Sequence, residues 1–497
     1  MTVSEYLAEI DAVNRGGVYQ PEWESLCTHP VPSWFPKAKF GIFIHWGVFT
    51  VPQAFNEWYP RHMYREGSPE HEDFKKRFGD MKHFGYKDLI PLFTAPAFDA
   101  DAWMDLFKEA GARYVTPVAE HHDGYQMYKS ALSHWNSAES GPHRDILGEL
   151  KEAAEKRGIV FCTSSHRAEH YWFMNGGRTF DSDVNDPSYD SFYGPAVYNE
   201  DLKDACPKNM YSVTIHSPRM REHCENWLAR TAEIIDRYHP NMLYFDWWIN
   251  NAAFRPYLKK LTAYYYNRAR EWGKEVTICY KLSAFPLDAA TFDVERGQLS
   301  SIRMRPWQTD TAIAENSWCY TENNAFKRAE TIVGDLVDIV SKNGCLMLNV
   351  GPRADGSICA QESDVLRKIG AWLKVNGEGI YDTRCWKTFG EGPTEIPEGQ
   401  FCDTARSAFT AQDIRYTCKN EYIYAFVLSA REGISEIRMN ALASGNIPDE
   451  AIVAEEAAVL GHDDVSVEIL HGKDALRLRL SRPVVSDYPV CIRLKTR

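Results

Sequence analysis

Six short apolar runs in the first 350 residues constrain the fold more than any other feature of the sequence. They are Phe40–Trp46, Tyr114–Ala119, Ile159–Ser165, Met242–Trp247, Val276–Tyr280 and Cys345–Val350. Each run is apolar at nearly every position, which is typical of strands that are covered on both faces. Amphipathic helical patterns accompany them, among them Trp227–Tyr238, Ala329–Val340 and Glu362–Val375. Strands that alternate with helices, without a glycine-rich dinucleotide loop after the first strand, predict an α/β fold of the (β/α)8-like TIM-barrel type.

The sequence changes character after Trp386. Residues 390–399 (GEGPTEIPEG) are rich in Gly, Pro and Glu, which is typical of a linker. Short runs beyond it alternate apolar and polar residues, as strands with one exposed face do; they are Tyr422–Leu428, Val465–Ile469 and Leu476–Leu480. We therefore expect two domains, a barrel over residues 1–385 and a small antiparallel β-sandwich over residues 386–497.

The charge balance disfavours nucleic acid as a partner. The chain has 497 residues with 56 Lys and Arg against 69 Asp and Glu, a formal net charge of −13, and no long basic run. No apolar run is long enough to span a membrane, and the acidic N-terminus lacks the basic and apolar segments of a secretory signal. The 12 cysteines are scattered singly, as small buried hydrophobic residues are. We therefore expect a cytoplasmic protein without nucleic-acid or membrane partners, and a homo-oligomer is left open.

Polar residues directly follow several of the predicted strands. Those at the strand ends are His45, His121, His122, His166 and Asp246. The carboxyl ends of the strands surround the active site of a parallel barrel, so these side chains should meet there. A single histidine of this kind is more often a core or loop residue, but four strand ends that agree favour a shared site.

A metal site is the alternative use of these histidines. Adjacent residues on a strand, such as His121 and His122, point to opposite faces, and the sequence has no HxH or HExxH spacing. We therefore expect no metal ion at this site.

The surroundings of Asp246 favour carbohydrate as the ligand. Asp246 follows the apolar run Met242–Phe245 and precedes two tryptophans, and a carboxylate in such a place costs free energy unless it is hydrogen-bonded or used in a reaction. Aromatic walls around carboxylates suit sugars, because the C–H faces of a sugar stack on rings while its hydroxyls bond polar groups. The tryptophans that could form such walls are Trp46, Trp58, Trp247, Trp248 and Trp318, although a core role suits Trp318 equally well.

A series of motifs, taken in order, resembles the α-L-fucosidases of glycoside hydrolase family 29. The motifs are Trp34–Gly47 (WFPKAKFGIFIHWG), Glu57-Trp58-Tyr59, His121-His122-Asp123-Gly124, Tyr244-Phe245-Asp246, the segment from Trp307 to Trp318, Val340–Gly344 and Leu348–Pro352 with Asp355-Gly356. The resemblance extends from about residue 20 to 385, and the tail looks like the C-terminal β-sandwich of that family. Each motif alone would be weak, but the ordered set is specific.

The resemblance implies a retaining exo-glycosidase that removes terminal α-L-fucose from oligosaccharides or glycoconjugates by double displacement, without a metal or organic cofactor. It implies that Asp246 is the nucleophile. The fucose-binding residues that it implies are His45, Glu57, Trp58, His121 and His122. His166 and Trp318 are further candidates, and so are Arg167 and Glu169 in the loop after the third strand.

The acid/base residue is less clear from the motifs. Many relatives carry Trp-Glu where this chain has Trp307-Gln308, and an amide cannot donate a useful proton. The segment 291–318 must therefore supply another carboxyl group, and we expect Glu295. The alternatives are Asp293, Asp310 and Glu315, and Arg296 could orient whichever carboxyl it approaches.

Two other functions stay open from the sequence. Gln308 is compatible with a non-catalytic fucose-binding protein that has lost its acid, although a binding-only pocket gains nothing from a desolvated Asp246. L-Galactose differs from L-fucose only by a hydroxyl on C6, and an apolar pocket rejects an added hydroxyl weakly, so α-L-galactosidase specificity is the second alternative. Leu348–Pro352 should close the barrel, and Glu120, where relatives often carry Lys, has no evident role.

Overall fold

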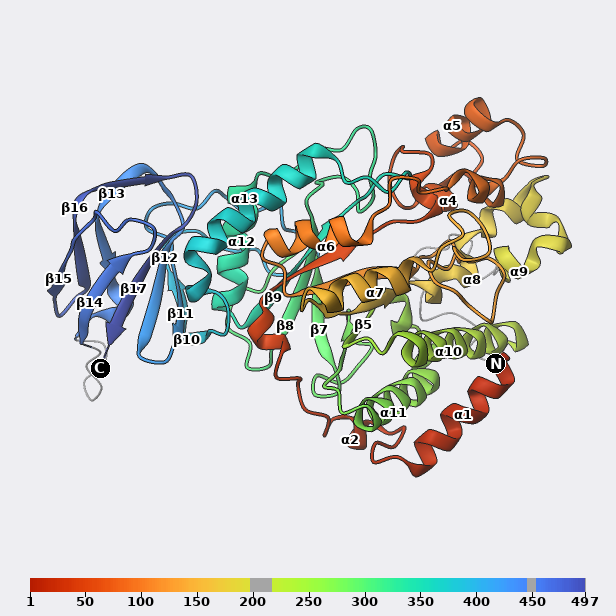
Figure 1. Ribbon diagram of the computed structural model, residues 1–497, viewed down its shortest axis with the longest axis horizontal. Coiled ribbons are helices and arrows are strands. Elements are labelled where there is room, and N and C mark those ends of the chain that lie inside the picture. Colours follow the sequence, from red (N-terminus) through yellow and green to blue (C-terminus); the bar gives the residue numbers. More distant parts are fainter. Residues whose placement is uncertain (197–216, 445–452, 497) are drawn as a thin grey trace.

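The computed structural model describes residues 1–196, 217–444 and 453–496. Its larger sheet is a closed parallel barrel (Figure 1). The strands are β1 (Phe40–Ile44), β2 (Tyr114–Glu120), β3 (Val160–Phe161), β4 (Thr163–Ser165), β5 (Met242–Phe245), β6 (Thr277–Tyr280), β7 (Thr291–Glu295), β8 (Trp307–Ala312) and β9 (Gly344–Val350). β3 and β4 both pair with β2 and form one interrupted strand, and β1 pairs with both β2 and β9, which closes the ring. The predicted TIM barrel is confirmed.

Two strands of the barrel were not predicted from the sequence. β7 (TFDVE) and β8 (WQTDTA) each carry polar residues among their apolar ones, yet almost every residue of both is buried. Asp293 and Glu295 point the same way on β7, as residues two apart on a strand must. The barrel interior thus holds acidic and amide groups on this side, and a search for continuous apolar runs does not detect such strands.

Helices surround the barrel, as Figure 1 shows. The long ones are α1 (Val3–Gly16), α5 (Pro69–Phe78), α6 (Ala100–Glu109), α7 (Ile146–Lys156), α10 (Pro218–Tyr238), α11 (Arg255–Glu271), α12 (Ala329–Ser341) and α13 (Ala360–Asn376). Single-turn helices are α2 (Trp23–Leu26), α3 (Phe35–Ala38), α4 (Tyr59–His62), α8 (His170–Phe173) and α9 (Asp190–Tyr193). No helix follows β6 or β7, since residues 281–290 and 296–306 form loops. Within the described residues, no helix is both long and apolar enough to cross a membrane.

Helix α10 shows how the sequence sets these elements. The Ser217 side chain caps its start by accepting a hydrogen bond from the Met220 N–H, with Pro218 in the first turn. The predicted stripe from Trp227 to Tyr238 is buried. The helix ends where His239 adopts a left-handed conformation (φ 47°) just before Pro240.

The C-terminal residues form two antiparallel sheets, as predicted. One has the order β10 (Arg384–Glu391), β11 (Ile414–Lys419), β12 (Tyr422–Val427), β17 (Val490–Thr496), β14 (Ala454–Val459). The other has the order β13 (Ala430–Met439), β16 (Leu476–Ser486), β15 (Val467–His471). Apolar side chains of both sheets, such as Tyr416 and Leu478, pack in one core, so the sheets form a sandwich.

The segment expected to be a linker has a more definite structure. Its first two residues end β10, and residues 392–413, here called the returning segment, lie against the barrel. The Phe401 N–H donates to the carbonyl of Glu295, and the N–H groups of Cys402 and Asp403 donate to the carbonyl of Arg296. The returning segment is therefore fixed at the carboxyl end of β7.

Candidate active site

A cavity of 130 Å³ lies at the carboxyl ends of the barrel strands. Nine of the candidate residues line it, namely His45, Glu57, Trp58, His121, His122, His166, Asp246, Glu295 and Trp318, and so do Trp247, a candidate wall residue, and Asp310, an alternative acid. Of the other candidates for the site, Trp46, Trp248, Arg167 and Glu169 do not line it. The sequence reasoning did not single out four further lining residues, namely Phe43, Tyr244, Lys281 and Phe401. The structure thus places most of the predicted residues in one enclosed, mostly polar and aromatic site.

Asp246 directly follows β5 and is held by contacts on both carboxylate oxygens. Its Oδ1 accepts from the Trp247 N–H (2.7 Å), and its Oδ2 lies 3.2 Å from His166 Nδ1 and 3.4 Å from His122 Nε2. Burial raises the pKa of this carboxyl group, but the nearby Lys281 ammonium and the two histidines outweigh burial and hold the pKa well below its ordinary value. Asp246 is therefore an ionised carboxylate in a closed site.

Lys281 directly follows β6 and joins three carboxyl groups. Its ammonium lies 2.6 Å from Glu295, 3.5 Å from Asp246 and 3.5 Å from Asp310, and the side chain is 2% exposed. Burial lowers the pKa of Lys281, but the three acidic neighbours outweigh it, and the net pKa lies well above its usual value. Lys281 is therefore a fixed cation between the two candidate catalytic carboxyl groups.

Glu295 ends β7 and differs from Asp246 in protonation. Burial raises its pKa to about 7, and Lys281 only partly opposes this, because Asp246 and Asp310 raise the pKa further. Glu295 and Asp246 both contact the Lys281 ammonium, at 2.6 and 3.5 Å respectively. The distance between the two contacting oxygens therefore cannot exceed the sum of these two distances. That limit is compatible with the roughly 5 Å separation of the carboxyl groups in retaining glycosidases.

The alternative acids occupy different places. Asp293 is fully buried inside the barrel, where it accepts from the Gln308 side-chain N–H (2.8 Å), and it does not line the cavity. Glu315 is exposed and also lies outside the lining. Asp310 does line the cavity, where its Oδ2 accepts from the Tyr244 hydroxyl (2.9 Å). Asp310 is therefore the only one of the three that competes with Glu295 on position.

Arg296 and Gln308 do not have the roles considered from the sequence. The Arg296 guanidinium donates to the carbonyls of residues 314, 315 and 317 and lies 4.6 Å from the Trp318 ring centroid, so it supports the cavity wall. The Gln308 side chain accepts from the Tyr114 hydroxyl and donates to Asp293 within the barrel. Gln308 is thus an interior residue, and an amide at this position removes no acid from the cavity.

Hydrogen bonds fix the opposite wall of the cavity. His45 Nδ1 lies 2.7 Å from Asn349 Oδ1, and the Asn349 side-chain N–H donates to the carbonyl of Trp318 (2.6 Å). Glu57 Oε2 accepts from the Trp318 N–H (2.9 Å). The strand β9 closes the barrel as predicted, and through Asn349 it also orients His45 and Trp318.

The four histidines of this wall have different pKa values. Burial lowers the pKa of His45 and of His121 well below 6.5, and the neighbouring histidines lower both further. Burial also lowers the pKa of His166, which Asp246 only partly offsets. Burial has the same effect on His122, but Glu169 and Asp246 outweigh it, and the net pKa is raised. Three of the histidines are therefore neutral near pH 7, able to donate and accept hydrogen bonds to hydroxyls.

The expected opposite orientation of His121 and His122 is wrong. β2 ends at Glu120, so both histidines lie in the turn beyond the strand and line the same cavity. Two groups there have ligand atoms within 4.8 Å of one another: His45 with His121 and His166, and His122 with His166 and Asp246. His45 Nδ1 and His166 Nδ1 already contact Asn349 and Asp246, respectively. The absence of a catalytic metal stays a prediction.

Double displacement at a sugar carbon needs one ionised and one protonated carboxyl group at short range. A parallel barrel with Asp246 and Glu295 at the carboxyl ends of its strands has the arrangement that a retaining glycoside hydrolase requires.

Comparisons with known proteins specify the family. A family model described as alpha-L-fucosidase matches residues 6–378. The tissue alpha-L-fucosidase of Bos taurus is 32% identical over 388 residues, which cover 75% of this chain and 74% of that protein. The human tissue alpha-L-fucosidase is 31% identical over 427 residues, covering 82% of this chain and 78% of that protein. The crystal structure of Thermotoga maritima alpha-fucosidase superposes with a TM-score of 0.71 at 27% identity and covers 96% of this chain and 100% of that one. The chain belongs to the α-L-fucosidase family.

Proposed function

We propose that the protein is a retaining exo-α-L-fucosidase that hydrolyses terminal α-L-fucosyl residues of oligosaccharides or glycoconjugates. The observation that carries this function is the pair of carboxyl groups on either side of Lys281, one ionised and one with a pKa of about 7. The small, enclosed cavity supports an enzyme that acts on a terminal residue, because a closed site admits one ring at the end of a chain.

The reaction has two displacements. The Asp246 carboxylate attacks the anomeric carbon as the bond to the leaving oxygen breaks, and Glu295 gives its proton to that oxygen. Glu295, now ionised, takes a proton from water, whose oxygen attacks the same carbon and releases Asp246. Two inversions restore the original configuration, and Glu295 ends protonated, so each group returns to its starting state.

The remaining lining residues bind the sugar in this proposal. His45, His121, His122, His166 and Glu57 take the hydroxyls, and Trp58 and Trp318 supply apolar walls; their placement around one cavity supports these roles. Phe401, which is 64% exposed, also lines the cavity from the returning segment. Its contact with the end of β7, which carries Glu295, supports a place on the leaving-group side.

A parallel assay of an aryl α-L-fucoside and the matching α-L-galactoside tests this function. We expect turnover of the fucoside with initial release of the α-anomer, observed by ¹H NMR, and much weaker turnover of the galactoside. Equal or faster turnover of the galactoside would shift the specificity to L-galactose. Binding of fucose without turnover would instead support a non-catalytic protein. Gln308 is no longer evidence for that alternative, because its side chain lies inside the barrel.

Two further properties belong to the proposal. We expect a chelator to leave turnover unchanged, because no step of the mechanism above needs a metal. We also propose a reducing compartment such as the cytoplasm; the 11 cysteines within the described residues are all free, and Cys206 lies outside those residues. Counting thiols on the denatured native protein should give close to the 12 in the sequence, whereas several intact disulfides would contradict this compartment.

A further inference from the structure

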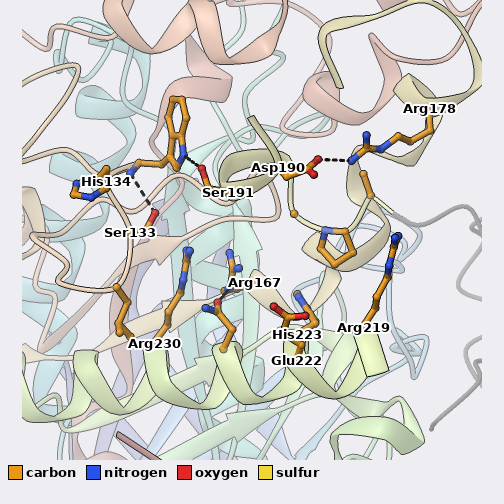
Figure 2. A pocket seen from close by; sticks show the side chains of 16 residues that line it. Ser133, His134, Arg167, Arg178, Asp190, Ser191, Arg219, Glu222, His223 and Arg230 are labelled. Atoms are coloured by element: carbon orange, nitrogen blue, oxygen red, sulfur yellow. Dashed lines mark hydrogen bonds and ion pairs between the residues drawn. The ribbon is translucent and has the colours of Figure 1, made fainter. Parts of the chain in front are cut away.

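A second cavity, of 970 Å³, shares no lining residue with the fucose site; Figure 2 shows the side chains that line it. Helix α10 forms one side, and residues 132–135 and 190–196 form the other. Four arginines line it, Arg167, Arg178, Arg219 and Arg230, and we call it the arginine cavity. Two carboxylates, Asp190 and Glu222, also line it, and Asp190 pairs with Arg178 (3.0 Å). None of the four arginines lines the fucose site, so the two cavities are distinct. Its volume is sufficient for a small organic ligand.

The regular spacing of α10 builds the floor of the arginine cavity. Arg219, His223, Asn226 and Arg230 follow one another at intervals of three or four residues, so they share one face of the helix. Figure 2 shows Arg230, His223 and Arg219 rising from this helix, with Arg167 among them. One face of α10 therefore forms a polar wall of the cavity.

At the floor of the arginine cavity, the carboxylate of Glu120 pairs with two arginines. Glu120 Oε1 accepts from Arg167 Nη1 (2.5 Å) and from Arg230 Nη1 (2.8 Å), and each of the three side chains is at most 8% exposed. Within the described residues, no other carboxylate lies within ion-pair distance of either arginine. The buried Nε of Arg230 has no hydrogen-bond partner. The group thus has two positive charges and one negative charge.

Burial and the excess of positive charge together lower the pKa of neighbouring basic groups. Burial and then the nearby Arg230 lower the pKa of Arg167 to about 10. Burial, followed by Arg167, also lowers the pKa of His170 to about 3 and that of His223 well below its usual value. A buried cation without a partner is costly, and the planar donors of guanidinium groups match the oxygens of a carboxylate or sulfate.

We propose that the arginine cavity binds the oxyanion of a small ligand, a carboxylate or a sulfate, between Arg167 and Arg230, with Arg219 at the rim. The oxyanion completes the charge balance that Glu120 provides only in part. The same chemistry could come from a free inorganic anion or from an acidic sugar. The site does not depend on the fucosidase reaction, so its test does not use turnover.

Isothermal titration calorimetry on the full chain tests the site with two pairs of probes. Sodium sulfate is compared with sodium chloride at equal ionic strength, and glucuronate is compared with glucose. We expect saturable binding of sulfate or glucuronate and none of chloride or glucose. Saturation by sulfate alone would assign the site to a free anion, and tighter binding of glucuronate would assign it to an acidic sugar.

Variants locate the binding. Arg230→Gln should weaken binding about tenfold, the equivalent of one lost charged hydrogen bond. Arg219 does not pair with Glu120, so Arg219→Gln leaves the Glu120 ion pairs in place and tests the rim of the cavity even if Arg230→Gln folds poorly. We expect this variant to lose roughly threefold in affinity. Arg479→Gln, an exposed arginine of the sandwich, is the matched control and should bind as the wild type does. No saturable binding by the wild type, or equal binding by all variants, would overturn the proposal.

Discussion

The two walls of the fucose site both lie largely out of solvent but differ in how they hold charge. On the wall formed after β1, β2 and β4, burial lowers the pKa of His45, His121 and His166, and these rings are neutral. On the wall formed after β5, β6 and β7, burial raises the pKa of both carboxyl groups; Lys281 together with His122 and His166 reverses this for Asp246, whereas Glu295, which Lys281 contacts, keeps a pKa of about 7. The difference shows that two acids beside the same buried cation can differ in protonation when only one of them also receives hydrogen bonds from histidines. The histidine wall should therefore control binding, and the carboxyl wall should control chemistry and its pH dependence.

The largest effect should come from Asp246→Ala. Loss of the nucleophile should lower kcat by roughly a thousandfold or more. Azide, which is small enough to enter the vacated carboxylate space, should restore part of the turnover and give the β-fucosyl azide, since one displacement replaces two. The product is identified by ¹H NMR. Wild-type turnover by this variant would assign the nucleophile elsewhere.

The next effect should come from Glu295→Ala, and it should depend on the leaving group. General acid catalysis contributes roughly 10²–10⁴-fold, so natural fucosides should lose that much, while the first step with a nitrophenyl fucoside should lose far less. Because the acid must be protonated, kcat/KM of the wild type should fall as the pH rises through about 7, and this basic limb should disappear in the variant. An equal loss on both substrates with the limb intact would move the role to Asp310, the other acid in the cavity.

A smaller effect should come from Lys281→Met, which removes the charge and keeps the length of the side chain. We expect kcat/KM near pH 6 to fall roughly a hundredfold. Lys281 lowers the pKa of both Asp246 and Glu295, so without it both limbs of the pH–rate profile should move to higher pH. Lys259→Met on α11 is the matched control. Unmoved limbs would show that Lys281 is only structural.

The smallest of these effects should come from the histidine wall. His121→Ala removes one partner of a sugar hydroxyl, and kcat/KM should fall roughly ten- to a hundredfold. Both limbs of the pH–rate profile should stay in place, because no proton moves through this ring. The exposed His83→Ala serves as a control. A shift of the basic limb in His121→Ala would contradict the claim that only the carboxyl wall sets the pH dependence.

The sequence predicted the histidine wall better than the carboxyl wall, for a physical reason. Strands β1, β2 and β5 are nearly continuous apolar runs, so the polar residue at each end is easy to recognise. β7 and β8 carry Asp293, Glu295 and Asp310 among apolar residues, and their burial depends on partners from other strands. Glu295 could be reached only by exclusion within residues 291–318.

Two residues of the site illustrate what sequence reasoning missed. Lys281 follows the run Val276–Tyr280, so the same rule that found Asp246 would have found it, had lysine been considered a strand-end candidate. Phe401 left no such signal. It reaches the cavity because backbone hydrogen bonds fix the returning segment to β7, a long-range contact that composition and periodicity do not encode.

Trapping the glycosyl-enzyme tests the central assignment most directly. In 2-deoxy-2-fluoro-α-L-fucosyl fluoride, the fluorine at C2 slows both displacements, and the fluoride leaving group needs no acid, so the covalent intermediate should accumulate. Digestion and mass spectrometry of the inactivated enzyme should locate one 2-fluorofucosyl ester on Asp246. A label on another carboxylate, or inactivation that leaves Asp246 unmodified, would contradict the account.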